Sequence, residues 1–192
     1  EKLTYVLPLT LAIIVILLYL NFRAFSEVAI IIVTLPMAMI GGLWLMYLEG
    51  FNFSVAVGVG FIALAGVAVE IGVIMLVYLN QALAELKEKA EERAEAISDD
   101  AYQDALLQGA GLRVRPVMMT VATIIIGLMP ILYGTGTGSE VMSRIAAPMV
   151  GGMTSAVLLT LIVLPAIYSI VKKPEVNAFN KGLSNLELDN NA

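Results

Sequence analysis

The stretch "VAVGVGFIALAGVAVEIGVIMLVYL" (residues 55–79) decides the fold, because it is apolar or glycine throughout except for one carboxylate, Glu70. A helix needs about 20 apolar residues to cross the roughly 30 Å hydrocarbon core of a bilayer. The stretch therefore predicts a transmembrane helix over 55–80. A charged carboxylate near the bilayer centre costs about 3 kcal/mol on translocon-based scales, so we expect Glu70 to face the interior of a helix bundle or a water-filled cavity.

Four further stretches have the same length and apolar character. The whole sequence is 59% hydrophobic and only 14% charged, a composition that excludes a soluble globular protein. The predicted fold is therefore all-α, a polytopic membrane helix bundle with three transmembrane helices in residues 1–80 and two in 117–172. We place these five helices at about 3–22, 27–48, 55–80, 117–136 and 145–171.

The segments outside the bilayer are polar. Residues 81–116 have a helix-forming composition, interrupted near their end by Gly109 and Gly111, and predict a cytoplasmic loop that holds a polar helix followed by a short amphipathic helix at the membrane interface. Residues 173–192 are rich in Asn and show no apolar periodicity, so we expect a disordered cytoplasmic tail.

Lysine and arginine are unevenly divided between the two sides of the predicted bundle, and the richer side should be the cytoplasm. Lys2 and Arg144 fall on one side. The other basic residues share the opposite side, together with the C-terminus: Arg23, Lys87, Lys89, Arg93, Arg113, Arg115, Lys172, Lys173 and Lys181.

Small residues on the third predicted helix indicate where its neighbours approach. Ala68 and Gly72 lie four residues apart, as do Ala56 and Gly60, and this spacing allows close helix contact in membranes. We therefore expect the 55–80 helix to lie centrally, with Ala68 and Gly72 letting neighbouring helices close in around Glu70.

Several kinds of chemistry are excluded by residue content. The chain has no Cys and no His, so it has no disulfide, thiolate zinc site or imidazole ligand. It also has no ATP-binding P-loop and no membrane-protease motif, so we expect no enzyme and no cofactor. The net charge of −5 arises mainly from the loop at 85–104, which indicates a solvated segment and no nucleic-acid partner.

Two further groups of residues are candidates for function. Thr120 and Thr123 offer hydroxyl groups on the fourth predicted helix, although a threonine often bonds its own helix backbone. A methionine thioether is a soft ligand that suits Cu(I) or Ag(I). Most of the 10 methionines fit packing or lipid contact, but Met142 lies at a polar membrane edge between "GTGTGSE" and "SRIAAPM".

Four segments carry a family resemblance. They are "NFRAFSEVAIIIVTLPMAMIGG" (21–42), "GFIALAGVAVEIGVIMLVYL" (60–79), "LRVRPVMMT" (112–120) and "GLMPILYGTGTGSEVMSRIAAPM" (127–149). Together they resemble the last five transmembrane helices, the eighth to the twelfth, of heavy-metal efflux pumps of the resistance-nodulation-division superfamily, copper/silver type. The resemblance covers about residues 3–172.

This resemblance implies a proton-driven antiporter of twelve transmembrane helices in a bacterial inner membrane, with the C-terminus in the cytoplasm. It also implies a homotrimer that contacts membrane lipid and joins a periplasmic adaptor protein and an outer-membrane channel. The implied cargo is Cu(I) or Ag(I), because copper/silver pumps have a glutamate in the tenth helix, where Glu70 stands.

The resemblance also implies roles for single residues. Glu70, Thr120 and Arg113 match the proton relay, and Met142 matches a methionine of the metal pathway. Copper/silver pumps have a lysine directly after the "RVRP" proline, whereas this chain has Val117. A relay that pairs a lysine with acidic groups is therefore incomplete here, and Thr120 or water would have to fill the gap.

Two alternatives remain open from the sequence. The same fold could export divalent zinc, cobalt or cadmium, or organic compounds. A different class of function is a helical membrane scaffold or degenerate fragment that transports nothing, which the non-Met start and Val117 would fit.

Overall fold

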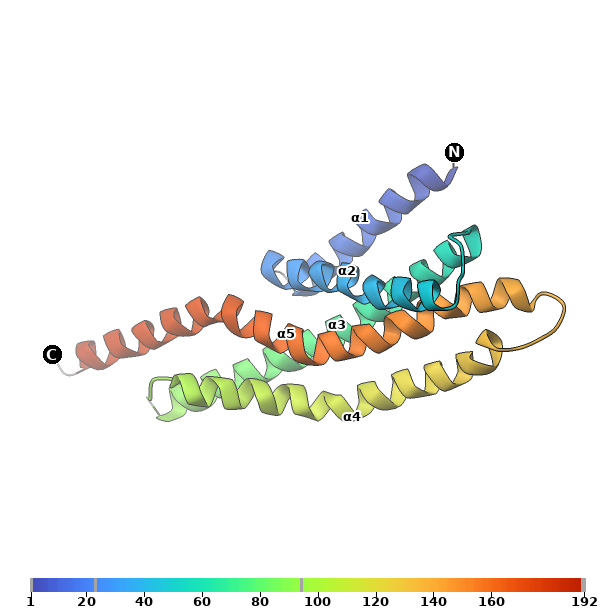
Figure 1. The fold of residues 1–192 in the computed structure, drawn as a ribbon. Coiled ribbons are helices and arrows are strands. Elements are labelled where there is room, and N and C mark those ends of the chain that lie inside the picture. Colours follow the sequence, from blue (N-terminus) through green and yellow to red (C-terminus); the bar gives the residue numbers. More distant parts are fainter. Residues whose placement is uncertain (1, 23, 94, 191–192) are drawn as a thin grey trace.

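The computed structural model is a bundle of long helices (Figure 1), and it describes residues 2–22, 24–93 and 95–190, without the side chains of 2–4, 7 and 186–190. Arg23, one of the basic residues used above to predict orientation, lies outside this described part. The helices are α1 (Lys2–Phe22), α2 (Phe25–Leu48), α3 (Val55–Arg93), α4 (Asp99–Leu132) and α5 (Ser139–Asn190).

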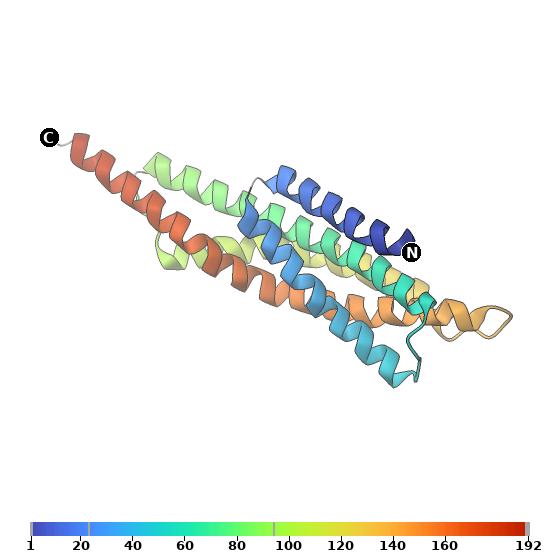
Figure 2. The same cartoon turned by 90° about the horizontal axis from the view of Figure 1, so that it is seen from above.

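The predicted all-α fold is confirmed, and four of the five expected spans each lie within one of these helices. The span expected at 117–136 begins within α4 but extends past the end of that helix at Leu132. Four of the helices, α2 to α5, are long and apolar enough to cross a membrane, and α1 contributes a shorter apolar stretch, Pro8–Phe22, within the described residues. α5 packs against α2, α3 and α4, so it is as central as α3. Figures 1 and 2 show α1 at the edge of the bundle, where it packs against α2 alone among the described helices.

The region predicted as a loop with two helices differs from expectation. α3 continues through the polar residues to Arg93, and the short interfacial helix is the first part of α4, which runs without a break into the fourth span. Ser98 caps α4, because its hydroxyl accepts a hydrogen bond from the Ala101 N–H at 3.2 Å. Gly109 does not end the helix. A β-carbon there would lie 2.7 Å from that of Ala82, so this glycine allows α4 to pack closely on α3.

The tail also differs from expectation. In place of a disordered segment at 173–192, α5 continues as a helix to Asn190. This part of α5 docks on the turn between α3 and α4 through Asn180, whose side-chain amide donates to the Ile97 carbonyl and accepts from the Ile97 N–H, both at 2.9 Å. Lys173 adds an ion pair with Asp99 at 2.8 Å. A long-range contact therefore orders a segment that lacks apolar periodicity.

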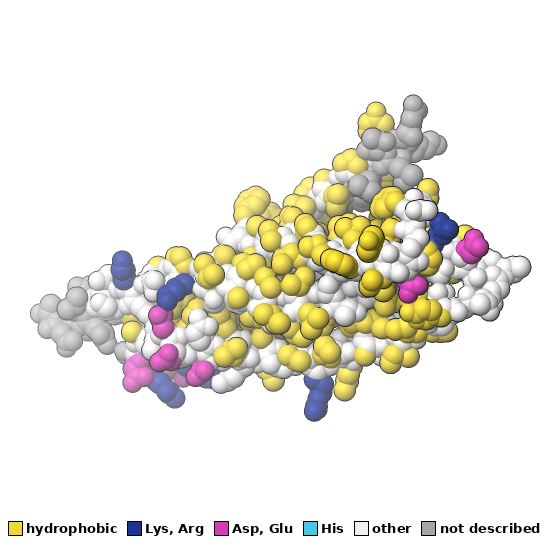
Figure 3. Space-filling view, in the orientation of Figure 1, with side chains coloured by type: hydrophobic (Ala, Val, Ile, Leu, Met, Phe, Trp, Pro, Cys, Tyr) yellow, Lys and Arg dark blue, Asp and Glu magenta, His cyan; other side chains and the backbone are white. Residues whose placement is uncertain are grey.

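Charged and apolar surfaces are separated along the bundle (Figure 3). Most of the charged side chains gather at the end where α3 ends, α4 begins and α5 ends, and a few lie at the opposite end. The surface between is largely hydrophobic, as expected for helices that face lipid.

Helices approach each other closely at several glycines. β-Carbons on Gly41 of α2 and on Gly151 of α5 would each lie 2.5 Å from the carbonyl oxygen of the other glycine. A β-carbon on Gly60 of α3 would lie 2.5 Å from the Ile145 carbonyl oxygen of α5. Substitution at these positions would push the backbones apart.

Candidate functional site

Glu70 lies midway along the apolar part of α3 and is exposed. Its neighbour Ile71 is buried, in a cluster with Leu64 on α3 and Val121 on α4. Within the described part of the chain, Glu70 makes no hydrogen bond or ion pair. The expectation that Glu70 faces the interior of the bundle is therefore not met by these five helices alone.

The small residues predicted for helix packing do bring helices together, but on the side of α3 opposite Glu70. Ala68 is 4% exposed and packs with Ala38 of α2 and Ala156 of α5. Gly72 is buried next to Thr34 of α2, whose hydroxyl oxygen would lie 3.8 Å from an added β-carbon. Successive residues of a helix are about 100° apart, so residues 68 and 72 each point some 200° away from residue 70.

The threonines of α4 are bonded locally. The Thr120 hydroxyl donates to the Pro116 carbonyl at 3.1 Å, and the Thr123 hydroxyl donates to the Met119 carbonyl at 2.8 Å. Both side chains are exposed, and no hydrogen bond joins Thr120 to Glu70 among the described residues. Thr120 therefore keeps its hydroxyl on its own helix, the alternative weighed from the sequence.

Val117, which directly follows the "RVRP" proline, is 7% exposed in an apolar cluster. Its companions include Ile71, Leu64 and Val121. A valine suits this apolar contact between α3 and α4.

Arg113 lies one turn before Val117 in α4, closer to the charged end of the bundle. Its guanidinium carbon stands 3.8 Å from the centre of the Tyr78 ring of α3, within cation–π distance. Its Nε atom is buried and has no hydrogen-bond partner among the described residues. The stacking holds α4 to α3 and leaves part of the arginine's donor capacity unused.

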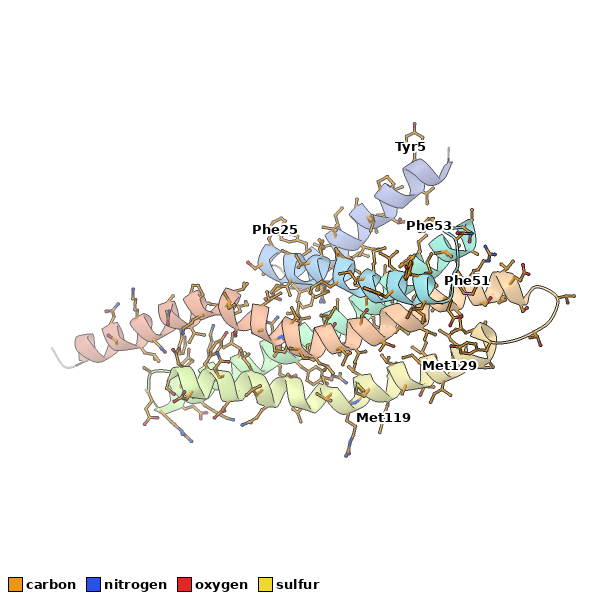
Figure 4. All side chains as sticks on the ribbon, viewed as in Figure 1. Tyr5, Phe25, Phe51, Phe53, Met119 and Met129 are labelled. Carbon is orange, nitrogen blue, oxygen red and sulfur yellow. The ribbon has the colours of Figure 1, made fainter. Side chains whose placement is uncertain are left out.

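Met142, the predicted metal ligand, is 57% exposed at the start of α5. It lines an open pocket of about 310 Å³ formed mainly by the glycine- and threonine-rich connection from Gly134 to Gly138. Among the described residues, no other methionine lines this pocket. Figure 4 shows Met119 and Met129 along α4, where they are 63% and 40% exposed and fit the predicted role in packing or lipid contact. A soft-metal site at Met142 would need ligands from outside this pocket.

Comparison with known proteins agrees with the fold and with the quoted motifs. A profile described as the AcrB/AcrD/AcrF family matches residues 1–172. The chain belongs to this family. It is 54% identical over 171 residues to the putative cation efflux system protein SilA of Salmonella typhimurium and equally so to the cation efflux system protein CusA of Escherichia coli K12. Each match covers 89% of this chain and 16% of the relative.

A solved crystal structure of a heavy metal efflux pump superimposes on this AcrB/AcrD/AcrF-family chain with a TM-score of 0.74 at 36% identity, covering 89% of this chain and 16% of the pump. The resemblance to heavy-metal efflux pumps inferred from the motifs is confirmed. The chain spans about one sixth of the length of these relatives.

One polar cluster in the structure was not predicted from the sequence. Glu27, in the first turn of α2, is 3% exposed and forms an ion pair with Lys172 of α5 at 3.0 Å. Glu27 has the features of an ordinary interfacial residue, because it lies at the start of a predicted span. The available signal was that both residues lie at span ends on the same predicted side of the membrane.

Proposed function

We propose that this chain is part of a proton-driven exporter of Cu(I) and Ag(I) in a bacterial inner membrane. Membership of the AcrB/AcrD/AcrF family supports a transporter, and the names of SilA and CusA support a cation as the cargo. Glu70 supports the coupling to protons and, through the family pattern, the monovalent metal. Met142 adds one soft thioether at the membrane edge.

The exposed position of Glu70 carries this proposal. A carboxylate in the apolar part of a span is costly to expose to lipid, so it needs a polar partner or water. These five helices supply neither a hydrogen bond nor an ion pair to Glu70 among the described residues. We infer that Glu70 faces further parts of the pump, where its partner completes a site that takes up and releases protons.

Thr120 and Arg113 extend the proposal to α4. Arg113 lies toward the charged end of the bundle, and its buried Nε has unused donor capacity for water or an acid beside the relay. The Thr120 hydroxyl can still accept a hydrogen bond while it donates to Pro116. We also propose that the complete protein is a homotrimer that joins a periplasmic adaptor and an outer-membrane channel. Its C-terminus would lie in the cytoplasm.

The test is Glu70→Gln in the complete protein that contains this chain. The amide cannot carry a proton, so we expect metal-driven proton movement in proteoliposomes and copper and silver tolerance in cells to fall by about a hundredfold or more. Glu91→Gln, an exposed position near the end of the same helix, is the matched control and should behave as the wild type.

Unchanged transport and tolerance in the Glu70→Gln variant would overturn the assignment of Glu70. Tolerance of zinc, cobalt or cadmium in place of copper would favour the divalent cargo, the second candidate. A complete protein that restores tolerance to no metal would favour a scaffold.

A further inference from the structure

Three helices meet in a cluster of polar side chains at the charged end of the bundle, and the proposed function uses none of them. The Oε1 atom of Glu27 (α2) pairs with the Lys172 ammonium (α5) at 3.0 Å. The Oε2 atom accepts a hydrogen bond from the Asn80 side-chain amide (α3) at 2.8 Å. The Asn80 oxygen in turn accepts from the Tyr168 hydroxyl (α5) at 2.5 Å. Both oxygens of the buried acid and both ends of the Asn80 amide therefore have partners.

The charges in this cluster balance. Lys172 also contacts Glu175 at 2.9 Å, and Glu175 accepts a hydrogen bond from Lys87 of α3 at 2.7 Å. Two carboxylates thus face two ammonium groups. A buried ion pair contributes little net stability when compared with apolar packing, and its best-attested use is to fix one register of packed helices.

The surroundings of Asn80 show why a register needs fixing. Around it, α2, α3 and α5 pack through aliphatic side chains such as Ile31, Leu79 and Leu164. Apolar burial is non-directional, whereas a hydrogen bond requires a defined distance and angle. Tyr168 and Lys172 lie one turn apart and so on one face of α5. Rotating α3 by one residue, about 100°, would remove Asn80 from both Glu27 and Tyr168.

The orientation that Asn80 fixes also sets the direction in which Glu70 points, because both residues lie on the same continuous helix, α3. α3 contains no proline, whereas proline occurs inside each of the other helices. Sharp kinks arise mainly at proline, so α3 should transmit a rotation along its length. Asn80 follows Glu70 by ten residues, which is roughly 15 Å along a helix.

We propose that Glu27, Asn80, Tyr168 and Lys172 form a positioning network that fixes the rotation and height of α3 and thereby places Glu70 in the proton-coupling site. This inference rests on the proposed function. In this role α2, α3 and α5 move as one unit during transport. The four residues act through Glu70 and do not themselves carry the transported proton.

The decisive variant is Asn80→Asp in the complete protein, reconstituted in proteoliposomes. It preserves shape but replaces the donor amide by a second carboxylate facing Glu27. We expect the maximal rate of copper-driven proton movement to fall about tenfold and the pH of half-maximal rate to shift by about one unit, because Glu70 is displaced. In the double variant with Glu27→Gln, the amide at position 27 can donate to the carboxylate at position 80, the reverse of the wild-type hydrogen bond. This variant should restore both the maximal rate and the pH of half-maximal rate.

Gln81→Glu is the matched control, since it makes the same change of amide to carboxylate one residue further along α3. Gln81 is exposed, and its side chain bonds weakly to Glu85 at 3.4 Å. The control should keep the wild-type rate and pH profile. An Asn80→Asp variant with wild-type rate and pH profile would overturn the inference, as would a folded double variant that remains impaired.

Tyr168→Phe keeps the test decisive if Asn80→Asp fails to fold. It removes only the hydroxyl that donates to Asn80, so we expect a smaller loss of rate with a pH shift in the same direction. A folded Tyr168→Phe variant with no shift would contradict the network. Failure of the proposed function would appear separately, as absence of metal-driven proton movement in the wild-type protein.

Discussion

Glu27 and Glu70 are both carboxylates on apolar helices, yet their surroundings are opposite. Glu27 is 3% exposed, and both of its oxygens are engaged by neighbouring helices. Glu70 is exposed and has no polar partner among the described residues. An acid that is fully satisfied within one bundle can hold helices in place. An unsatisfied acid in an apolar span is suited to a reaction that needs a further partner.

The largest loss of stability should come from removing Lys172, the cationic partner of Glu27. Lys172→Met leaves a buried carboxylate without its cation, and breaking a buried ion pair in this way costs about 3–5 kcal/mol. We expect a corresponding loss in the free energy of unfolding of the purified chain in detergent micelles, measured by denaturant titration.

The neighbouring lysine provides the control for this prediction. Lys173 pairs with Asp99, and both side chains are largely exposed, at 48% and 74%. Exposed pairs contribute about 0–1 kcal/mol, so Lys173→Met should change the stability little. Equal losses in the two variants would show that Glu27 does not depend on its buried cation.

The difference between the two acids explains which parts of the site can be predicted from the sequence alone. Glu70 stands out because every residue near it in the chain is apolar or glycine, and the spans follow from hydropathy. The pairing of Glu27 with Lys172 joins the second helix to the last, and local patterns carry no information about such a pair. Glu27 also has the ordinary features of a first-turn acid.

The same reason accounts for the differences in the fold. The sequence suggested a break near Gly109 and a disordered tail, because glycine and Asn-rich segments disfavour isolated helices. In the structure, Gly109 packs on Ala82 of α3, and Asn180 bonds Ile97 in the turn before α4. Tertiary contacts therefore override local preference in both places.

A smaller effect should follow from neutralising each acid. Glu27→Gln weakens the buried ion pair with Lys172 and replaces an acceptor of the Asn80 amide, which should cost about 1–3 kcal/mol. Glu70→Gln removes no contact within the described chain, so its stability should stay within about 0.5 kcal/mol of the wild type. Thermal unfolding of the purified chain in micelles measures both. A larger loss of stability from Glu70→Gln than from Glu27→Gln would contradict the conclusion that only Glu27 has partners within the described chain.

The smallest effect concerns Glu175, which lies outside the positioning network and contacts its member Lys172. The hydrogen bond from Lys87, and the nearby Lys172, hold the pKa of Glu175 below its ordinary 4.5. The charged form therefore stabilises the fold above about pH 4.5, and this contribution is lost as the pH falls through the lowered pKa. Because Glu175 is half-exposed, we expect Glu175→Gln to cost less than about 1 kcal/mol near neutral pH. Melting curves of the two proteins should converge in acid, and a gap that widens as the pH falls would contradict the ion pair.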